Sequence, residues 1–317
     1  ARERAPRLLA PAPPACAPVC AANLVTSTTA ADGTVKMLVS LADGLSVECV
    51  LIPMHSGKHT PLCVSSQVGC ARACTFCSTG TMGRLRNLSV DEILSQVWLA
   101  LRHVREHGMP RLVNVVFMGM GEPLDNFENV RASVELLVDP DAFGFSRRNV
   151  VVSTVGTSPT AIRRAAALPC KLAWSVHAAD DALRKMLVPT TSYPMTELRD
   201  ELREALAAKP GGDKARVLLV EVALLGGVND RPMHADQLAA LLHPFGRGEL
   251  IVNLIPYNEN GLGIGGVPFR TAQTADVYRF QRKLWDHGLL CTVRAQRGHE
   301  SSAACGQLAT TKVISMS

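Results

Sequence analysis

Short runs of β-branched and aliphatic residues alternate with helical stretches through most of this 317-residue chain, and that alternation limits the folds it can adopt. The runs with strand character lie at 113–118, 150–154, 172–176, 217–222, 251–255 and 292–294. Strands separated by helices pair in parallel, because a parallel connection needs a crossover that a tight turn cannot make. The pattern therefore predicts an α/β fold of parallel βα units, arranged as a barrel or as an open sheet.

Two further segments precede these units. Residues 32–62 have the pattern of a β-hairpin lead-in around a turn at Asp43 and Gly44. Residues 1–31 hold five Pro and ten Ala, with three Arg against one Glu. A segment of this composition buries little apolar surface, so it is predicted to be a disordered leader. We expect residues 63–309 to form the globular core and residues 310–317 to be a tail.

Composition bears on the compartment and on the partners. The chain has no uninterrupted apolar run of 18 residues, so a membrane partner is not expected. Ten cysteines in a chain of this length are too few for a disulfide scaffold, which favours a reducing compartment, the cytoplasm. If the acid-poor leader is a transit peptide, the compartment is instead a chloroplast or another organelle. The net charge of +5 is compatible with an anionic partner but does not identify one.

Three cysteines form the most informative cluster in the sequence. Cys70, Cys74 and Cys77 have the spacing C-x3-C-x2-C, and three thiolates so spaced can converge on one inorganic centre. Structural zinc usually takes four ligands from paired knuckles, and the chain holds no second C-x2-C pair. A 4Fe-4S cluster held by three cysteines leaves one iron open for a substrate. The spacing favours one 4Fe-4S cluster, with a zinc loop that borrows a distant His or Cys as the alternative.

Polar residues follow several of the predicted strands. In parallel βα folds the active site collects at the carboxyl ends of the strands. The segment M-G-M-G-E-P at 118–123 has two glycines that let backbone approach a ligand, and Glu122 can accept a hydrogen bond from an ammonium group. An ordinary turn with a solvated Glu122 is the alternative. The other polar residues at these ends are Ser153, Ser175, His177, Asn253 and Asn258.

Six motifs in order along the chain resemble one known family. They are L-C-V-S-S-Q-V-G-C-A-R-A-C-T-F-C-S-T-G at 62–80, R-N-L at 86–88, M-G-M-G-E-P-L at 118–124, S-V-H-A at 175–178, N-L-I-P-Y-N at 253–258 and A-A-C-G-Q-L-A at 303–309. The sequence is similar to the adenine-C2 RNA methyltransferases of the RlmN type, with their Cfr-type relatives, in the radical S-adenosylmethionine superfamily. The resemblance implies a partial (β/α)6 barrel of the TIM type with an N-terminal β-hairpin extension.

The resemblance also implies roles for individual residues. Cys70, Cys74 and Cys77 match the cluster ligands. The positions that match binding to S-adenosylmethionine are Gly121, Glu122, Ser153, Ser175, Val176, His177 and Asn258. Cys305 matches the cysteine that is methylated during the reaction, Cys63 matches its redox partner, and Glu48 matches the proposed proton acceptor. Without the resemblance to the family, Cys63 and Cys305 are also compatible with a purely structural role as small packed residues. The remaining cysteines are interpreted as structural.

The implied reaction uses two molecules of S-adenosylmethionine per turnover and one 4Fe-4S cluster. One molecule methylates the Cys305 thiolate. Cleavage of the other supplies a radical that removes hydrogen from this S-methyl group, and the resulting methylene radical adds to C2 of adenine. Cys63 then releases the product by forming a disulfide, which must be reduced. The implied partners are ribosomal RNA, and transfer RNA as a further substrate, an electron donor such as flavodoxin or ferredoxin, and a thiol reductant. The protein is expected to act as a monomer.

Two other functions remain open at this point. The Cfr-type activity, which methylates C8 of adenine, uses the same cysteines. A non-catalytic RNA-binding protein with a structural metal site is the alternative from another class. For either RNA function, six side chains near the cysteines are candidate phosphate contacts or else solvated surface charge: Arg72, Arg84, Arg86, Arg294, Arg297 and His299.

Overall fold

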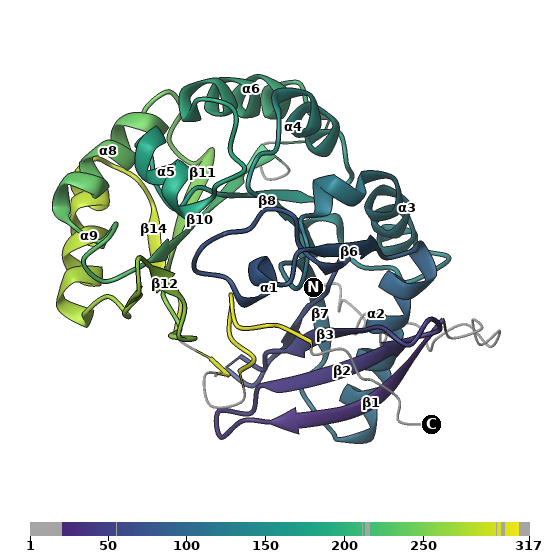
Figure 1. Cartoon of the computed structure of the whole chain (residues 1–317). Coiled ribbons are helices and arrows are strands. Elements are labelled where there is room, and N and C mark those ends of the chain that lie inside the picture. Colours follow the sequence, from purple (N-terminus) through teal and green to yellow (C-terminus); the bar gives the residue numbers. More distant parts are fainter. Residues whose placement is uncertain are drawn as a thin grey trace, which may run out of the picture.

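Ten strands form one continuous sheet in the described part of the chain (Figure 1). We analysed a computed structural model that describes residues 21–54, 56–210, 212, 216–295, 297–298 and 302–310. The strand order is β1-β2-β3-β4-β7-β8-β9-β10-β11-β14. The sheet is antiparallel from β1 to β4 and parallel from β4 to β14. The α/β fold predicted from the alternating pattern is confirmed.

The parallel strands curve around a central space (Figure 1). They are β4 Thr60–Cys63, β7 Leu112–Phe117, β8 Val150–Thr154, β9 Lys171–Ser175, β10 Leu218–Leu224, β11 Leu250–Pro256 and β14 Cys291–Val293. All six strands predicted from the sequence are present. β4 is an additional parallel strand, and it lies mostly inside the segment predicted as the hairpin. β14 and β1 are the two ends of the sheet order, so the barrel is open in the described residues.

Helices cover the outer side of the curved sheet (Figure 1). The principal helices are α2 Val90–Glu106, α3 Phe127–Val138, α4 Pro159–Ala166, α5 Asp181–Leu187, α6 Met195–Ala207, α8 Pro232–Leu242 and α9 Thr274–Asp286. The longer helices bury an apolar stripe, as Val277, Phe280 and Leu284 show on α9 at helical spacing. None of the helices in the described residues combines the length and the apolar composition needed to cross a membrane.

Several short elements complete the chain. They are α1 Ser78–Thr81, the 3-10 helices η1 Pro123–Asn126 and η2 Arg147–Asn149, the pair β5 Gln67–Gly69 and β6 Arg84–Asn87, and the pair β12 Gly263–Ile264 and β13 Val267–Pro268. The α1 turn lies inside the arc of the sheet, directly after the cysteine cluster (Figure 1). The loop that carries the cysteines therefore faces the central space.

The N-terminal extension has three strands where a hairpin was predicted. Strands β2 Val35–Leu41 and β3 Ser46–Leu51 flank the predicted turn. Strand β1 Ala22–Thr29 lies in the segment predicted to be disordered, and for these residues that prediction was wrong. Their side chains are exposed after Ala22, because β1 is an edge strand held by backbone hydrogen bonds to β2. Residues 1–20 of the predicted leader lie outside the described residues.

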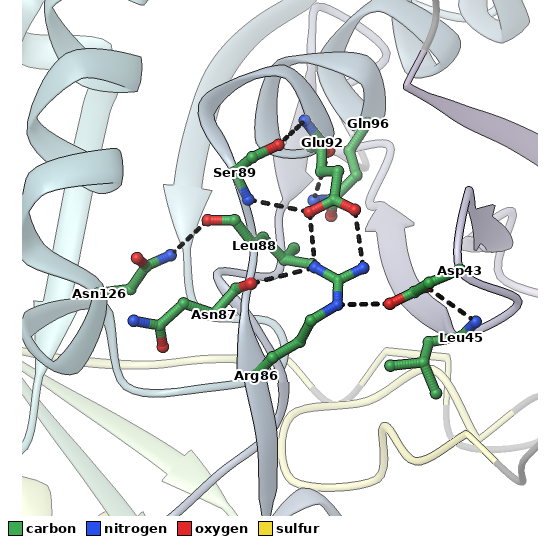
Figure 2. A network of polar contacts seen from close by, with 9 residues as sticks. All are labelled: Asp43, Leu45, Arg86, Asn87, Leu88, Ser89, Glu92, Gln96 and Asn126. Carbon is green, nitrogen blue, oxygen red and sulfur yellow. Dashed lines mark hydrogen bonds and ion pairs between the residues drawn. The ribbon is translucent and has the colours of Figure 1, made fainter.

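Arg86 joins this extension to the core (Figure 2). Its guanidinium donates to both carboxylate oxygens of Glu92, at 2.8 Å each, and to Asp43 at 2.6 Å. Glu92 and Ser89 form a capping box at the start of α2, and Asp43 lies in the turn between β2 and β3. The R-N-L motif therefore holds three elements together. For Arg86, the structure favours an internal ion pair over the predicted phosphate contact.

Replacing Arg86 by alanine is expected to lower the free energy of unfolding by about 2 kcal/mol. The substitution leaves the buried Glu92 carboxylate without its bidentate partner, while the 31% exposure of the Arg86 side chain keeps the cost below that of a fully buried pair. Urea unfolding measures the loss. Arg279→Ala, which breaks the exposed pair with Asp276, is the matched control and should cost less than about 0.5 kcal/mol.

The same pair makes stability depend on pH. Burial alone would raise the pKa of Glu92, but the hydrogen bonds from Arg86 and Ser89 outweigh it and hold the pKa below its usual 4.5. A carboxyl group with a lowered folded pKa contributes stability above its unfolded pKa and loses it as the pH falls through the folded value. The Arg86→Ala variant should therefore lose less stability than the unmodified protein as the pH drops below 4.5. Equal acid losses in both proteins would contradict this assignment.

Candidate active site

A cavity lies where the parallel strands end, next to the cysteine loop. Most of the predicted site residues line it: Cys74, Cys77, Gly121, Glu122, Ser153, Ser175, His177, Asn258 and Cys305. Residues far apart in the sequence thus meet at one place, as the topology of parallel βα units requires. The other predicted site residues, Cys70, Cys63, Val176 and Glu48, are not part of this wall.

The three clustered cysteines belong to one loop between β5 and α1. Burial raises the pKa of all three thiols, that of Cys70 to about 12. The charge of Cys77 adds to the effect at Cys70 and Cys74, and the charge of Cys305 adds to it at Cys77. Within the described ranges, no group of three or more His, Cys, Asp or Glu side chains converges closely enough to hold a single metal ion. The loop thus lacks the four-ligand arrangement of a structural zinc site in these residues.

Gly80 lets the α1 turn pack directly on this loop. A Cβ atom at this position would lie 2.9 Å from the Cys74 carbonyl oxygen and 3.0 Å from the Cys74 nitrogen. Gly80 also donates a backbone hydrogen bond to Cys77 at 2.9 Å. The absence of a side chain at Gly80 therefore fixes the spacing between two of the three thiols.

The Gly80→Ala variant is expected to take up roughly half as much iron and sulfide as the unmodified protein, or less, because the added methyl group must displace the backbone of Cys74. Iron and sulfide analysis after anaerobic reconstitution measures the effect. Gly212→Ala is the matched control, since no atom lies within 4 Å of a Cβ built there. Full incorporation in the Gly80 variant would show that the loop tolerates the displacement.

Glu122 is a buried carboxylate at the end of the β7 segment. Its Oε1 accepts from the Leu124 nitrogen and its Oε2 from the Val155 nitrogen, both at 3.0 Å. Burial nevertheless raises the pKa of Glu122 to about 7. Because the carboxylate is buried, the solvated-turn alternative for Glu122 is not supported. A cationic ligand in the cavity would favour the ionised form of this carboxylate.

Gly121 lies in the cavity wall and has a packing role in addition to the predicted one. It adopts a φ of +99°, and a Cβ atom there would lie 2.6 Å from the Gln67 Cβ and 2.9 Å from the Gln67 nitrogen. Its lack of a side chain is therefore required by packing against β5 as well as by its place in the cavity wall. The Gln67 side chain in turn accepts from the Glu122 nitrogen at 2.9 Å and so orients that residue.

His177 presents a neutral ring to the cavity. Burial lowers its pKa well below the usual value, and Nδ1 accepts from the Ala223 nitrogen at 3.1 Å. This bond assigns the proton to Nε2, which leaves a donor on the other side of the ring. The ring also meets Phe76 edge-on, with centroids 4.8 Å apart. His177 thereby contacts the cysteine loop through the residue next to Cys77.

Hydroxyl and amide groups complete this wall. Ser153 on β8 and Ser175 on β9 share a hydrogen bond of 3.2 Å. Asn258 is buried, and its Oδ1 has no hydrogen-bond partner in the described part of the protein. Val176 is different, because its side chain is in the core and its carbonyl accepts from Ala178 and Arg184. The structure thus does not bring Val176 to the cavity surface.

Cys305 and Cys63 lie near one another and near Arg294. Cys63 ends β4, and burial raises the pKa of its thiol, the charge of Cys305 adding to the effect and that of Arg294 opposing it. Both cysteines are free thiols. Arg294 lines the cavity beside Cys305. The predicted pair of cysteines is therefore brought together with a cation at its side.

Glu48 lies beneath the C-terminal segment. Its Oε1 pairs with the Lys36 ammonium group at 3.0 Å, and its Oε2 accepts from the Ala309 nitrogen at 3.1 Å. Burial raises its pKa, although the hydrogen bond and the charge of Lys36 oppose that rise. Glu48 is thus tied to the backbone four positions beyond Cys305.

Comparison with known proteins identifies the family of this chain. A family model described as "Radical SAM superfamily" matches residues 64–231. Two relatives named "Dual-specificity RNA methyltransferase RlmN", from Stenotrophomonas maltophilia (strain K279a) and Xanthomonas campestris pv. campestris (strain B100), are 41% and 42% identical to this chain. Each match covers 90% of this chain and 72% of the relative. The chain belongs to the RlmN family.

A solved structure agrees with this assignment. It is described as the crystal structure of a radical SAM methyltransferase from Sphaerobacter thermophilus and aligns with a TM-score of 0.81 and 38% identity, over 91% of this chain and 81% of that one. This RlmN-family protein is therefore an enzyme, a radical SAM RNA methyltransferase. The alternative of a non-catalytic RNA-binding protein is excluded.

Membership of the RlmN family implies a 4Fe-4S cluster and S-adenosylmethionine, and the residues present fit both. The three thiols of Cys70, Cys74 and Cys77 lie on one loop and would be the residues to hold such a cluster. The unpartnered Oδ1 of Asn258, the Nε2–H of His177 and the carboxylate of Glu122 offer both acceptors and a donor to a polar cationic ligand.

Sequence reasoning missed two charged residues of this RlmN-family site. Arg184 on α5 is fully buried and donates to the Val176 and Val155 carbonyls. Burial lowers its pKa to about 10, while the nearby Cys74 and Glu122 oppose that change. Glu221 lies within the apolar β10. A single carboxylate in an apolar strand is a signal that could have identified it, whereas Arg184 resembles the surface arginines around it.

The predicted phosphate contacts are only partly at the surface. Arg72 pairs with Asp125 at 3.0 Å, and Arg294 faces the interior of the barrel. Arg84 is exposed near the cysteine loop. Arg297 donates to the Asp32 carbonyl at 3.1 Å. His299 lies outside the described residues, so its role stays a prediction.

Proposed function

We propose that this protein methylates C2 of an adenosine in large-subunit ribosomal RNA, and of an adenosine in transfer RNA, with Cys305 as the methyl carrier. The name of its relatives, dual-specificity RNA methyltransferase, supports an RNA substrate. The observation that carries the proposal is that Cys305, from the C-terminal segment, lines the same cavity as Cys74, Cys77 and Glu122. A thiol in that position is beside the residues that fit the cluster and S-adenosylmethionine.

The C-terminal segment is held firmly against the cysteine loop. The Ser78 nitrogen donates to the Gly306 carbonyl at 2.7 Å, and the Thr79 hydroxyl donates to the Leu308 carbonyl at 2.6 Å. Because Ser78 directly follows Cys77, these bonds relate the position of Cys305 to that of the cluster loop. This preorganisation supports a role for Cys305 in the reaction itself.

The chemistry of C2 explains the need for a carrier. C2 is an electron-poor ring carbon, so it does not displace a methyl group from a sulfonium as an ordinary nucleophile. The Cys305 thiolate does so, forming a carbon–sulfur bond as the methyl–sulfonium bond breaks and releasing S-adenosylhomocysteine. The reduced cluster, when bound, supplies the electron that cleaves a second S-adenosylmethionine and so activates the methyl group. Each turnover thus consumes two molecules of S-adenosylmethionine.

Cys63 and Glu48 complete the proposed assignment. After the activated carbon has joined C2, the adduct loses the C2 proton to Glu48 and returns one electron to the redox centre that supplied it, and the buried Glu48 carboxylate with a raised pKa suits a base. Cys63 then forms a disulfide bond to the Cys305 sulfur as the sulfur–carbon bond breaks. The carbon keeps the electron pair and takes up a proton to become the product methyl group. A thiol reductant returns both cysteines to thiols.

The reaction sets requirements for other partners. A low-potential protein such as flavodoxin or ferredoxin is proposed as the electron donor. A monomer is proposed as the active form.

The position of the transferred methyl group tests the proposal. The reconstituted enzyme should transfer label from methyl-labelled S-adenosylmethionine to C2 of one adenosine when offered ribosomal RNA, and to C2 of an adenosine when offered transfer RNA. Digestion to nucleosides and mass spectrometry distinguishes C2 from C8. Label at C8 would replace the proposed reaction with the Cfr-type activity.

A further inference from the structure

A second chamber continues from the active-site cavity into the interior of the barrel. Its wall includes Pro61 on β4, Asn114 on β7, Val151 on β8 and Leu219 on β10, so it runs along the inner face of the parallel strands. Six residues line both the chamber and the cavity: Met118, Glu221, Ile255, Asn258, Arg294 and Cys305. The chamber and the cavity therefore meet at these side chains, and Cys305 faces both.

Three polar side chains at this boundary form a chain of contacts. The Thr292 hydroxyl donates to Asn253 Oδ1 at 3.1 Å, and Asn253 Nδ2 donates to Glu221 Oε2 at 2.9 Å. Glu221 is only 4% exposed, and burial raises its pKa. Its Oε1 accepts no hydrogen bond in the described residues. The network fixes one carboxylate oxygen and leaves the other available at the chamber wall.

Arg294 lies between this carboxylate and the carrier thiol. Its Nη1 is 3.9 Å from Glu221 Oε2, and among all neighbours the charge of Cys305 acts on it most strongly. Its guanidinium donates no hydrogen bond within the described ranges, whereas its backbone is fixed by a 2.8 Å bond to the Leu254 carbonyl. Along the wall, the Cys305 thiol is therefore followed by the Arg294 guanidinium, a hydrogen-bond donor, and then by the Glu221 carboxylate, a hydrogen-bond acceptor.

Adenine has the complementary order along one edge. Beside C2 lies N1, which accepts a hydrogen bond, and beyond it the 6-amino group, which donates. We propose that Arg294 and Glu221 bind this edge, Arg294 donating to N1 and Glu221 Oε1 accepting from the 6-amino group, with Asn253 and Thr292 as positioning residues. This inference rests on the proposed C2 methylation.

Such binding selects the base as well as the reacting atom. Guanine has a donor at N1 and an acceptor at position 6, so it would meet Arg294 and Glu221 with both contacts reversed. A hydrogen bond from Arg294 to N1 also withdraws electron density from the adjacent C2. The same pair therefore accounts for recognition of adenine and for its orientation toward Cys305.

Target RNA with purine riboside in place of adenosine tests the contact to Glu221, because purine riboside lacks the 6-amino group. The unmodified enzyme should methylate the adenosine RNA about 10- to 100-fold faster than the purine riboside RNA. In Glu221→Ala the ratio of these two rates should fall to between about one and three, because the acceptor is gone. Glu135→Gln, which changes an exposed carboxylate, is the control and should keep the full ratio. A full ratio in Glu221→Ala would overturn the inference.

A second measurement needs no change in Glu221. RNA with 1-deazaadenosine at the target should compete for the unmodified enzyme about 10-fold or more weakly than adenosine RNA, and about equally for Arg294→Met. Equal competition for the unmodified enzyme would overturn the contact to N1.

Methylation of Cys305, read by peptide mass spectrometry without RNA, verifies that each variant is folded and loaded. Label at C2 with no sensitivity to N1 or the 6-amino group would reject only this inference, whereas label at C8 would reject the proposed function as well.

Discussion

Replacing Cys305 by alanine is expected to abolish methyl transfer to RNA, with a loss of about 10⁴-fold or more, the scale seen when a catalytic nucleophile is removed. The protein should still fold and take up iron. The segment around Cys305 is held by backbone carbonyls, those of Gly306 and Leu308, and these bonds do not involve the thiol. The variant should also show no methylated cysteine peptide.

Label transfer from S-adenosylmethionine to RNA, iron content and thermal unfolding measure the three properties separately. Cys291→Ala is the matched control, because Cys291 is also a free thiol but is buried on β14. That variant should lose about 1 kcal/mol of stability and keep its activity. If Cys305→Ala retained more than about one hundredth of the activity, the carrier role of Cys305 would be wrong.

Replacing Cys63 by alanine is expected to stop the reaction after the new carbon–carbon bond has formed. Without Cys63 no thiol attacks the Cys305 sulfur, so the base stays joined to the protein through a thioether. The variant should therefore accumulate an RNA–protein adduct that survives denaturing electrophoresis, at up to one equivalent, with little free product. The double variant lacking both cysteines should form no adduct.

Electrostatics explains why Cys63 reacts at the right moment. Burial raises the pKa of Cys63, and the charge of Cys305 raises it further, while Arg294 lowers it. Once Cys305 carries a carbon substituent it has no charge, so its contribution to the raised pKa of Cys63 disappears while burial and the opposing charge of Arg294 remain. Cys63 is thus deprotonated more readily when the adduct is present. Normal multiple turnover by Cys63→Ala, without an adduct, would reject this assignment.

The pattern of strands and helices was predictable because it depends on local properties of the sequence. The periodic apolar face and the capping box at Ser89 define α2, and the strand from Val150 to Thr154 has the bounds that its β-branched run predicts. Strand β1 was not predictable, because its polar side chains point to solvent and only its pairing with β2 makes it a strand. Edge strands of this kind carry little signal of their own.

The site residues that belong to short sequence motifs were predictable. The contacts that depend on how separate elements pack were not. The cysteine loop, Glu122 and His177 come from short motifs, and the structure brings them to one cavity. The ion pairs of Arg86 with Glu92 and of Glu48 with Lys36 join elements whose contact depends on tertiary structure. The sequence alone therefore left Arg86 undecided between an internal role and a phosphate contact.

Cys305 lies far beyond the cysteine loop and Glu122 along the chain, and this order affects how the site is assembled during synthesis. The cluster loop and Glu122 leave the ribosome long before Cys305, and domains begin to fold from the N-terminal side. The C-terminal segment then closes onto partners that already exist, namely Ser78, Thr79 and Glu48. An incomplete chain could thus hold every residue of the cysteine loop and yet have no carrier for the methyl group. Under the proposed mechanism, the two halves of the reaction can be coupled only after Cys305 has been synthesised.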